Sequence, residues 1–281
     1  MLFNVLMYAL MIYLIFRMFS MNRGVNRRRR VITVINQIQD KDAFFAAADE
    51  LIANSAEEPD IAAKTKVIKL WGMVFHNTYD GFEELLEEID LRPLFTQKKG
   101  LLSIEENEDS FFYFLLAIPN MLYGNDRNDL RKLVEEKIRQ YDELLNGQMI
   151  AAVSKHCTLF YDKTEDLGEA FFRGISAGEY PENYRYSKQL IGIYKNVCDT
   201  MMCKILQDRN EDISDYEEYA KGFANSGVGS RWIKAVGLKI DLPSDEEEAE
   251  QAEETEETVS AEEETAEAEP EAEENKDETE E

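Results

Sequence analysis

The sequence of 281 residues contains few of the side chains that enzymes and metal sites use, with only three cysteines and two histidines. Cys198 and Cys203 are five residues apart, which does not fit the CxxC spacing of a zinc site. His156 and Cys157 are adjacent, but neighbours on a helix point about 100° apart and do not face each other as a nucleophile and its base must. We therefore predict no catalytic residue, no metal and no cofactor, and a protein that is not an enzyme.

Phosphate-binding glycines are also missing. The segment NSGVGSRW at Asn225–Trp232 has GxG spacing, but it follows a predicted helix and not a strand, so it indicates a turn. A basic excess is missing as well, since residues 31–244 hold 37 acidic and 24 basic residues and the whole chain has a net charge of −27. A protein that neutralises phosphates needs clustered Lys and Arg. We expect no nucleic-acid partner.

The first sixteen residues contain no charged side chain and make up most of an apolar stretch that ends at Met21. Between Leu2 and Met21 only Asn4, Arg17 and Ser20 are polar, and twenty helical residues span a hydrocarbon core of about 30 Å. A cleaved signal peptide needs basic residues before the apolar core and small residues at a cleavage site, and neither is present. We predict an uncleaved transmembrane signal-anchor helix over residues 1–21, in preference to a signal peptide or a buried core helix.

Six arginines lie at one end of this predicted span or follow it. They are Arg17, Arg23, Arg27, Arg28, Arg29 and Arg30. Because positive charge marks the cytoplasmic side, we predict a single-pass protein of the cell membrane with its N-terminus outside and its body and tail in the cytoplasm. Residues 22–30 then form a basic juxtamembrane segment beside anionic lipid, with a plain stop-transfer signal as the simpler interpretation.

The C-terminal segment 245–281 contains 21 acidic residues, one lysine and no aromatic residue. It cannot bury enough apolar surface to offset its ordering entropy, so we expect a disordered acidic tail. Two roles stay open for this tail: it keeps the protein soluble, or it contacts a basic segment of a protein partner.

The body between them, residues 31–244, has helical periodicity nearly throughout and predicts an all-α domain. The spacing predicts helices over 42–54, 59–75, 110–123, 128–145, 148–161, 165–177, 184–206 and 230–236, and two further helices begin at the capping-box patterns Asp80–Glu83 and Ser214–Glu217. The β-branched or apolar runs Val31–Ile38 and Phe111–Ile118 leave a small sheet as the alternative. Pairs such as Glu83 and Glu84 are expected to face solvent.

The expected helix over 184–206 carries two adjacent apolar stripes and should be buried on two sides, which favours antiparallel helix pairs in a bundle or a superhelical stack. Two stretches carry a resemblance, IKLWGMVF at Ile68–Phe75 and AFFRGISAGEYPENYRYSKQLIGIY at Ala170–Tyr194. Both resemble the helix-loop-helix units of tetratricopeptide-like (TPR-like) helical-repeat proteins. With Gly72 at the small position of a first helix, Glu84 and Glu88 fall where the second helix of that family has small and aromatic residues, and no 34-residue period recurs.

The resemblance implies an α-solenoid whose groove binds peptides or protein partners. Together with the predicted anchor, it favours a membrane-tethered, cytoplasmic protein-interaction or scaffold module. The alternative is an obligate accessory subunit of an integral-membrane complex, and an enzyme with no recognisable motif is the less favoured third interpretation. Tyr and Arg are enriched at interface hot spots, so Tyr180, Tyr184, Arg185 and Tyr186 form a candidate partner contact, although such a loop more often reflects simple inter-helix packing. We expect His76 at a helix end and Cys157 in the core.

Overall fold

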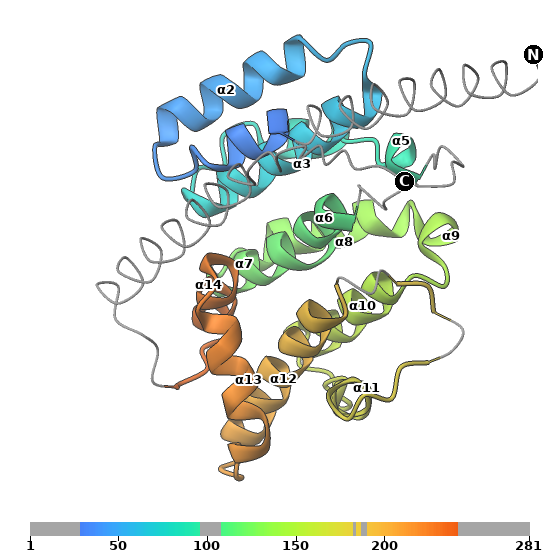
Figure 1. Ribbon diagram of the computed structural model, residues 1–281, viewed down its shortest axis with the longest axis vertical. Helices are drawn as coiled ribbons and strands as arrows, with labels where there is room; N and C mark the ends of the chain where they lie inside the picture. Colours follow the sequence, from blue (N-terminus) through green and yellow to red (C-terminus); the bar gives the residue numbers. More distant parts are fainter. Residues whose placement is uncertain (1–28, 96–107, 182–183, 187–189, 241–281) are drawn as a thin grey trace, which may run out of the picture. The chain divides into compact units, whose positions relative to one another are not determined.

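The computed structural model describes residues 29–95, 108–181, 184–186 and 190–240, and this part of the chain is helical with no named strand (Figure 1). The all-α prediction is therefore confirmed for the described residues. The helices are α2 (Lys41–Ala53), α3 (Pro59–Phe75), α4 (Phe82–Glu88), α5 (Arg92–Phe95), α6 (Glu108–Phe111), the π-helix η1 (Phe112–Ala117), α7 (Ile118–Gly124), α8 (Asn128–Arg139), α9 (Asp142–Leu145), α10 (Met149–Tyr161), α11 (Glu169–Ser176), α12 (Ile191–Asp208), α13 (Ser214–Ala224) and α14 (Gly227–Val236).

The predicted transmembrane segment 1–21 and the predicted tail 245–281 both lie outside the described residues. Among the described helices, none is both long and apolar enough to cross a membrane. Of the six predicted interface arginines, the structure describes two, Arg29 and Arg30, in a helical turn over 29–35. The Arg30 guanidinium donates to Glu58 Oε2 at 2.6 Å and to Ser55 Oγ at 3.0 Å, so this side chain contacts the helical body.

Helix α3 has the predicted bounds, and the bounds of α2 and α10 lie within one residue of those predicted, because the ends of helices carry local signals. Asp40 caps α2 by accepting a hydrogen bond from the Ala43 N–H at 3.1 Å, and α3 begins at Pro59, whose missing N–H costs nothing in a first turn. Residues 29–35 and the run Phe111–Ile118 are helical, so the alternative of a small sheet is wrong.

The two capping boxes are wrong, although helices begin at both places. Gly81, with φ +76°, precedes α4, and no side chain caps that helix. At α13, Ser214 is the first helical residue, and Asp212 supplies the oxygens that accept from its N–H and hydroxyl, both at 3.0 Å. The capping-box pattern therefore predicted where each helix begins, but not the contacts made at its first turn.

Three other boundaries differ from the predictions. The predicted helix 128–145 is broken at Gln140–Tyr141 into α8 and α9, where the Tyr141 hydroxyl donates to the Ile89 carbonyl at 3.1 Å and accepts from the Leu91 N–H at 3.2 Å. Helix α11 begins four residues later than expected, and α12 seven residues later, at Ile191. The predicted turn at 225–232 is a turn only at 225–226, and its remaining residues form the first part of α14, which Ser226 caps by accepting from the Gly229 N–H at 3.0 Å.

The π-helix η1 passes directly into α7, whose second residue is Pro119. Proline has no N–H to donate within the helix, and the Ser154 hydroxyl of α10 donates instead to the Leu115 carbonyl at 2.8 Å. This hydrogen bond explains why a serine is buried on the inner face of α10.

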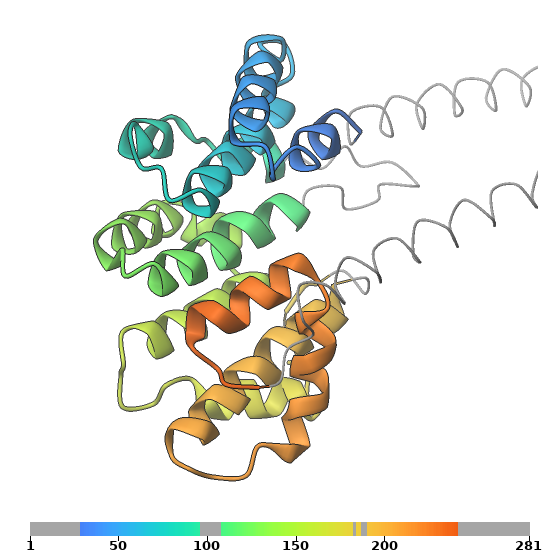
Figure 2. The ribbon, with the colours of Figure 1, turned by 90° about the vertical axis from the view of Figure 1, so that its left-hand side faces the viewer.

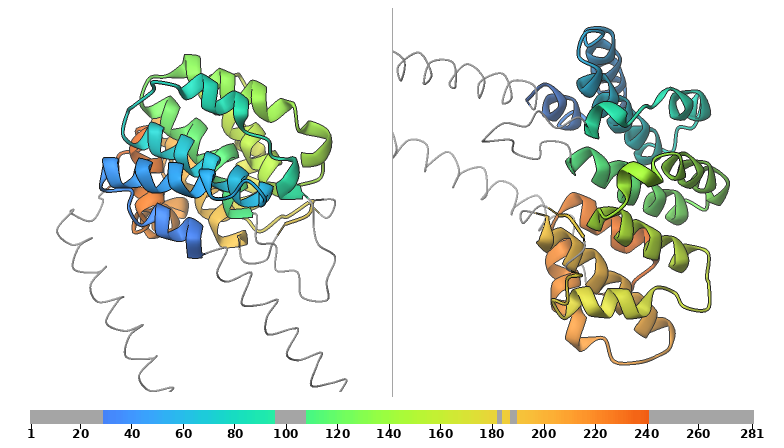
Figure 3. Two further views of the ribbon diagram at one scale, coloured as in Figure 1. Left: turned by 90° about the horizontal axis from the view of Figure 1, so that it is seen from above. Right: turned by 90° about the vertical axis from the view of Figure 1, so that its right-hand side faces the viewer.

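Helix α12 lies at the centre of the C-terminal half, packed against α11 on one side and α13 on another, as Figures 2 and 3 show. Its two predicted apolar stripes are buried except at the first residue of the helix, Ile191, which is half-buried; the buried members on α12 are Tyr194, Val197, Cys198, Met201, Met202, Ile205 and Leu206, and Leu190 is buried just before the helix. The prediction of a helix buried on two sides is thus confirmed.

Helix α14 packs against α7, a contact between segments more than 100 residues apart in the sequence (Figure 2). In a strictly sequential solenoid each unit contacts only its neighbours. Gly72 on α3 faces the Phe44 ring of α2, so α3 packs at this small residue against the helix before it in the chain. Glu84 and Glu88 on the following helix, α4, are exposed. The resemblance to TPR-like proteins stays a prediction.

Candidate functional site

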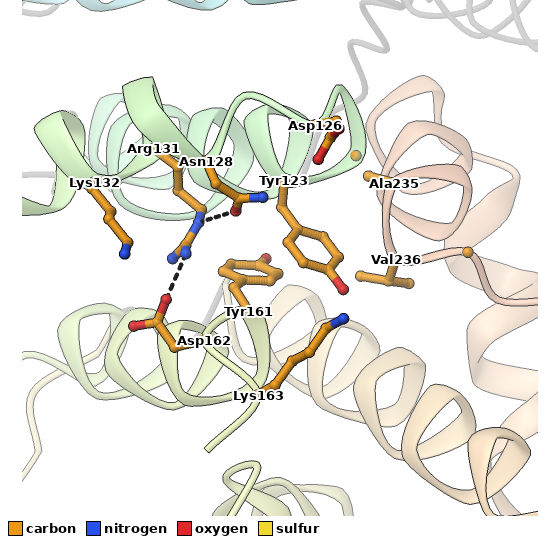
Figure 4. Close-up of a pocket in the computed structure, with 12 residues that line it drawn as sticks. Tyr123, Asp126, Asn128, Arg131, Lys132, Tyr161, Asp162, Lys163, Ala235 and Val236 are labelled. Atoms are coloured by element: carbon orange, nitrogen blue, oxygen red, sulfur yellow. Dashed lines mark hydrogen bonds and ion pairs between the residues drawn. The ribbon is translucent and has the colours of Figure 1, made fainter.

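A polar hollow of about 470 Å³ lies where the end of α7, the start of α8, the end of α10 and the end of α14 meet (Figure 4). We call it the α7–α14 pocket. Its lining is Tyr123, Gly124, Asp126, Asn128, Arg131, Lys132, Tyr161, Asp162, Lys163, Ala235, Val236 and Gly237. These residues come from three distant parts of the sequence, so the pocket exists only in the folded chain.

Close packing of two helices forms one wall of the pocket. A Cβ atom on Gly124 would lie 2.5 Å from the Ala235 Cα, so only glycine permits this approach of α7 to α14. After α7 the chain turns through Asn125, whose side-chain amide donates to the Val74 carbonyl at 3.2 Å and to the Tyr79 hydroxyl at 3.1 Å. These contacts hold the α7–α8 turn, and with it Asp126, against α3.

The floor of the pocket contains a buried charge network centred on Arg131, which is 1% exposed. Its guanidinium donates to Glu135, to Asp162 Oδ1 at 2.5 Å and to Asn128 Oδ1 at 3.0 Å, and Thr158 donates to Glu135 at 3.3 Å. Burial raises the pKa of Glu135, and the Arg131 charge only partly opposes this effect. A guanidinium with every arm paired is a structural support for the pocket.

Two tyrosines from different helices form an aromatic wall. The Tyr123 and Tyr161 rings are stacked with centroids 4.8 Å apart, and the Arg131 guanidinium lies 5.6 Å from the Tyr161 ring centre. Burial raises the pKa of both phenols, far more for Tyr161. The Tyr161 hydroxyl has no hydrogen-bond partner of normal geometry in the described structure, although Asn120 lies near enough to influence its pKa.

The rim carries charges of both signs. Asp126, Lys132 and Lys163 are exposed, and in the part of the chain that the structure describes they form no ion pair with a protein group. The last residues of α14 also reach the rim, where the negative end of the helix dipole and the terminal carbonyl groups lie. The pocket can therefore hold a polar, charged segment through hydrogen bonds and aromatic contact.

The thiols and imidazoles of the chain lie outside the pocket. All three cysteines are free and buried, and burial raises the pKa of each thiol, that of Cys203 to about 12. The imidazole of His156 stacks on Phe171 with centroids 3.9 Å apart, while Cys157 packs in the core as predicted. His76 is the C-cap residue of α3, as expected. No group of three or more potential metal ligands lies together among the described residues.

The four residues predicted from the sequence as a partner contact lie outside the pocket, in the loop between α11 and α12. The Tyr180 and Tyr186 rings are 5.8 Å apart, and both are half-buried, as is Tyr184. Arg185 is exposed, but its backbone N–H donates to the Gly147 carbonyl at 2.6 Å and its carbonyl accepts from Met149 at 2.9 Å. Its guanidinium donates to the Asn146 carbonyl at 3.2 Å, so this loop is fixed against the start of α10.

Sequence reasoning did not find the α7–α14 pocket. Its residues form no motif, and Arg131 resembles any charged residue on an amphipathic helix. The one available signal was Arg131 with Glu135 at i and i+4, a spacing that is more often exposed than buried. Comparison of the chain with protein-family models, with curated proteins and with solved structures gives no match.

Proposed function

We propose that this protein is a protein-interaction module and that the α7–α14 pocket binds a cationic side chain from a basic segment of a partner protein. The observation that carries this proposal is the composition of the pocket: the Tyr123 ring stacked on Tyr161, the Asp126 carboxylate and the C-terminal end of α14, beside a fully paired Arg131. These groups recognise charge and shape, and none of them is a nucleophile paired with a base.

The expected charge of the partner follows from the charged groups that line the pocket and from the net charge of the whole chain. A carboxylate, helix-terminal carbonyls and aromatic faces all attract a Lys or Arg side chain. Lys132 and Lys163 on the rim oppose this attraction, so the pocket suits one cationic side chain and not a dense basic cluster. The chain as a whole carries −27, which favours approach of a basic partner from a distance.

We further propose that the protein is a membrane-tethered scaffold, with the apolar segment 1–21 as its anchor and the body in the cytoplasm. Tethering would raise the local concentration of the body near membrane-bound partners, and the acidic segment 245–281 would add salt-sensitive attraction for the same basic segment. Protease added to intact cells should then leave the body and tail uncut. Digestion from outside would contradict this orientation.

Peptide binding tests the pocket directly. Fluorescence anisotropy of the full chain in detergent should show that a labelled peptide with one Arg or Lys among small polar residues binds more tightly than the same peptide with Glu. Asp126→Asn should weaken this binding several-fold. The matched control is Asp215→Asn, which removes the same charge from the exposed start of α13, away from the pocket lining, and should leave affinity nearly unchanged.

Two results would contradict this assignment. Tighter binding of the Glu peptide would show that Lys132 and Lys163 decide the specificity. Equal effects of the two Asp variants would show that only overall charge acts and that the pocket is not the binding site.

A further inference from the structure

A second, much smaller cavity lies near the α7–α14 crossing, with a volume of about 10 Å³. It is lined by Trp71, Ala117, Asn120, Met121, Val228, Arg231 and Trp232. Space of this size matches one water molecule, since about 10–15 Å³ of probe-occupied volume is the minimum that a water requires. The cavity is therefore too small for an organic ligand.

Two of its lining side chains carry buried polar atoms that no protein group satisfies. Asn120 on α7 is 0% exposed, and neither its Nδ2 nor its Oδ1 has a hydrogen-bond partner of normal geometry in the described structure, although the Tyr161 hydroxyl lies nearby. Trp232 on α14 is 1% exposed, and its Nε1 also has none. Buried polar groups in folded proteins are nearly always hydrogen-bonded to protein or to ordered water, so these three atoms at one cavity need an explanation.

We infer that this cavity is a binding site for a single structural water molecule that joins Asn120 to Trp232. The indole N–H can only donate, whereas the Asn120 side chain presents both an acceptor and a donor. Water accepts from Trp232 and donates to Asn120 Oδ1 at the same time, which no monatomic ion can do. A cation would face the indole N–H and the nearby Arg231 charge, and an apolar occupant would leave all three atoms unpaired.

The bound water has a structural consequence, because it links two helices that are distant in sequence. Asn120 belongs to α7 and Trp232 to α14, the same two helices that meet at Gly124 and Ala235. Helix α14 also supplies three lining residues of the α7–α14 pocket. The water is thus one of the contacts that hold this wall of the pocket in place, whichever ligand the pocket binds.

The chain has only two tryptophans, Trp71 and Trp232, so its indole N–H signals are simple to assign. In the full chain in detergent micelles, labelled with ¹⁵N-tryptophan, the Trp232 indole proton should show a cross-peak to a long-lived water. Trp71→Phe assigns the two signals. Asn120→Leu, which keeps the branched shape of the side chain and removes both polar atoms, should abolish the cross-peak, and Asn36→Leu at an exposed position should not.

Two further variants keep the test decisive. Tyr161→Phe removes a buried hydroxyl near Asn120, whose exchanging proton would imitate a water signal, and the Trp232 cross-peak must survive it. If Asn120→Leu fails to fold, Trp232→Phe keeps one aromatic ring and removes the N–H, and in a chain labelled with ¹⁵N-asparagine the water cross-peak to the Asn120 amide should then weaken at least several-fold. Absence of a cross-peak in the folded wild-type chain, its persistence in Asn120→Leu, or a xenon-induced shift of the Trp232 signal would overturn the inference.

Discussion

Replacing Arg131 by methionine tests the buried charge network that supports the α7–α14 pocket. Arg131 and Glu135 have side-chain exposures of 2% and 10%, so the substitution leaves a carboxylate buried without its counter-ion. Breaking one side of a buried pair costs about 3–5 kcal/mol of unfolding free energy. Asp162, the other partner, has a side chain that is 39% exposed, so the matched variant Asp162→Asn should cost only about 1 kcal/mol or less.

The pH dependence identifies the cause of that loss. Burial already raises the pKa of Glu135, and removing the positive charge of Arg131 should raise it further. A carboxyl group whose pKa is raised in the folded state destabilises that state as the pH rises above about 4.3, the pKa of a glutamate in the unfolded chain. The deficit of Arg131→Met should therefore be small near pH 4 and largest at neutral pH.

The measurement is thermal or urea unfolding of the full chain in detergent, followed by circular dichroism and tryptophan fluorescence. The double variant Arg131→Met/Glu135→Met should recover most of the lost stability, since hydrophobic replacement of a whole buried pair is often neutral or stabilising. Equal losses in Arg131→Met and Asp162→Asn, or a deficit that does not change with pH, would refute the argument that a buried unpaired Glu135 is responsible.

Three other predictions concern the core and its turns. Gly229→Ala should cost about 1–3 kcal/mol of unfolding free energy in the same assay, because the new Cβ would lie 1.8 Å from the Phe223 carbonyl oxygen. Gly222→Ala, where a Cβ meets open space, should stabilise α13 by up to about 1 kcal/mol, and equal effects of the two variants would contradict the steric argument. Thiol reagents at pH 8 should leave the folded chain unmodified and label all three cysteines after denaturation, since burial raises their pKa values, that of Cys203 to about 12; rapid labelling of folded protein would refute this. Met201→Asp should abolish the cooperative helical melt, because it places an unpaired charge at a site that is 0% exposed, and a native-like melt would show that α12 tolerates solvent there.

Local signals in the sequence were sufficient for most helices, since a helix is specified by the spacing of its apolar residues and by its end residues. The bounds of α3 were predicted correctly because Pro59 fixes its start and Phe75 ends its apolar pattern. The predicted start of α12 was wrong because apolar spacing continues through the loop, where Arg185 is instead held by the backbone of Gly147 and Met149. A pattern cannot distinguish residues that pack as a loop from residues that pack as a helix.

The sequence by itself determined the helical class of the body, because helical periodicity is a local property that extends over nearly all of it. It also identified the apolar residues of α12 that are buried. Only the tertiary structure decided that α14 returns to α7, that Arg131 is buried while its neighbour Lys132 is exposed, and that Asn120 and Trp232 share one cavity. These outcomes depend on which helices meet, and pairing between distant helices depends on shape, such as the absence of a Cβ at Gly124, which no periodicity records.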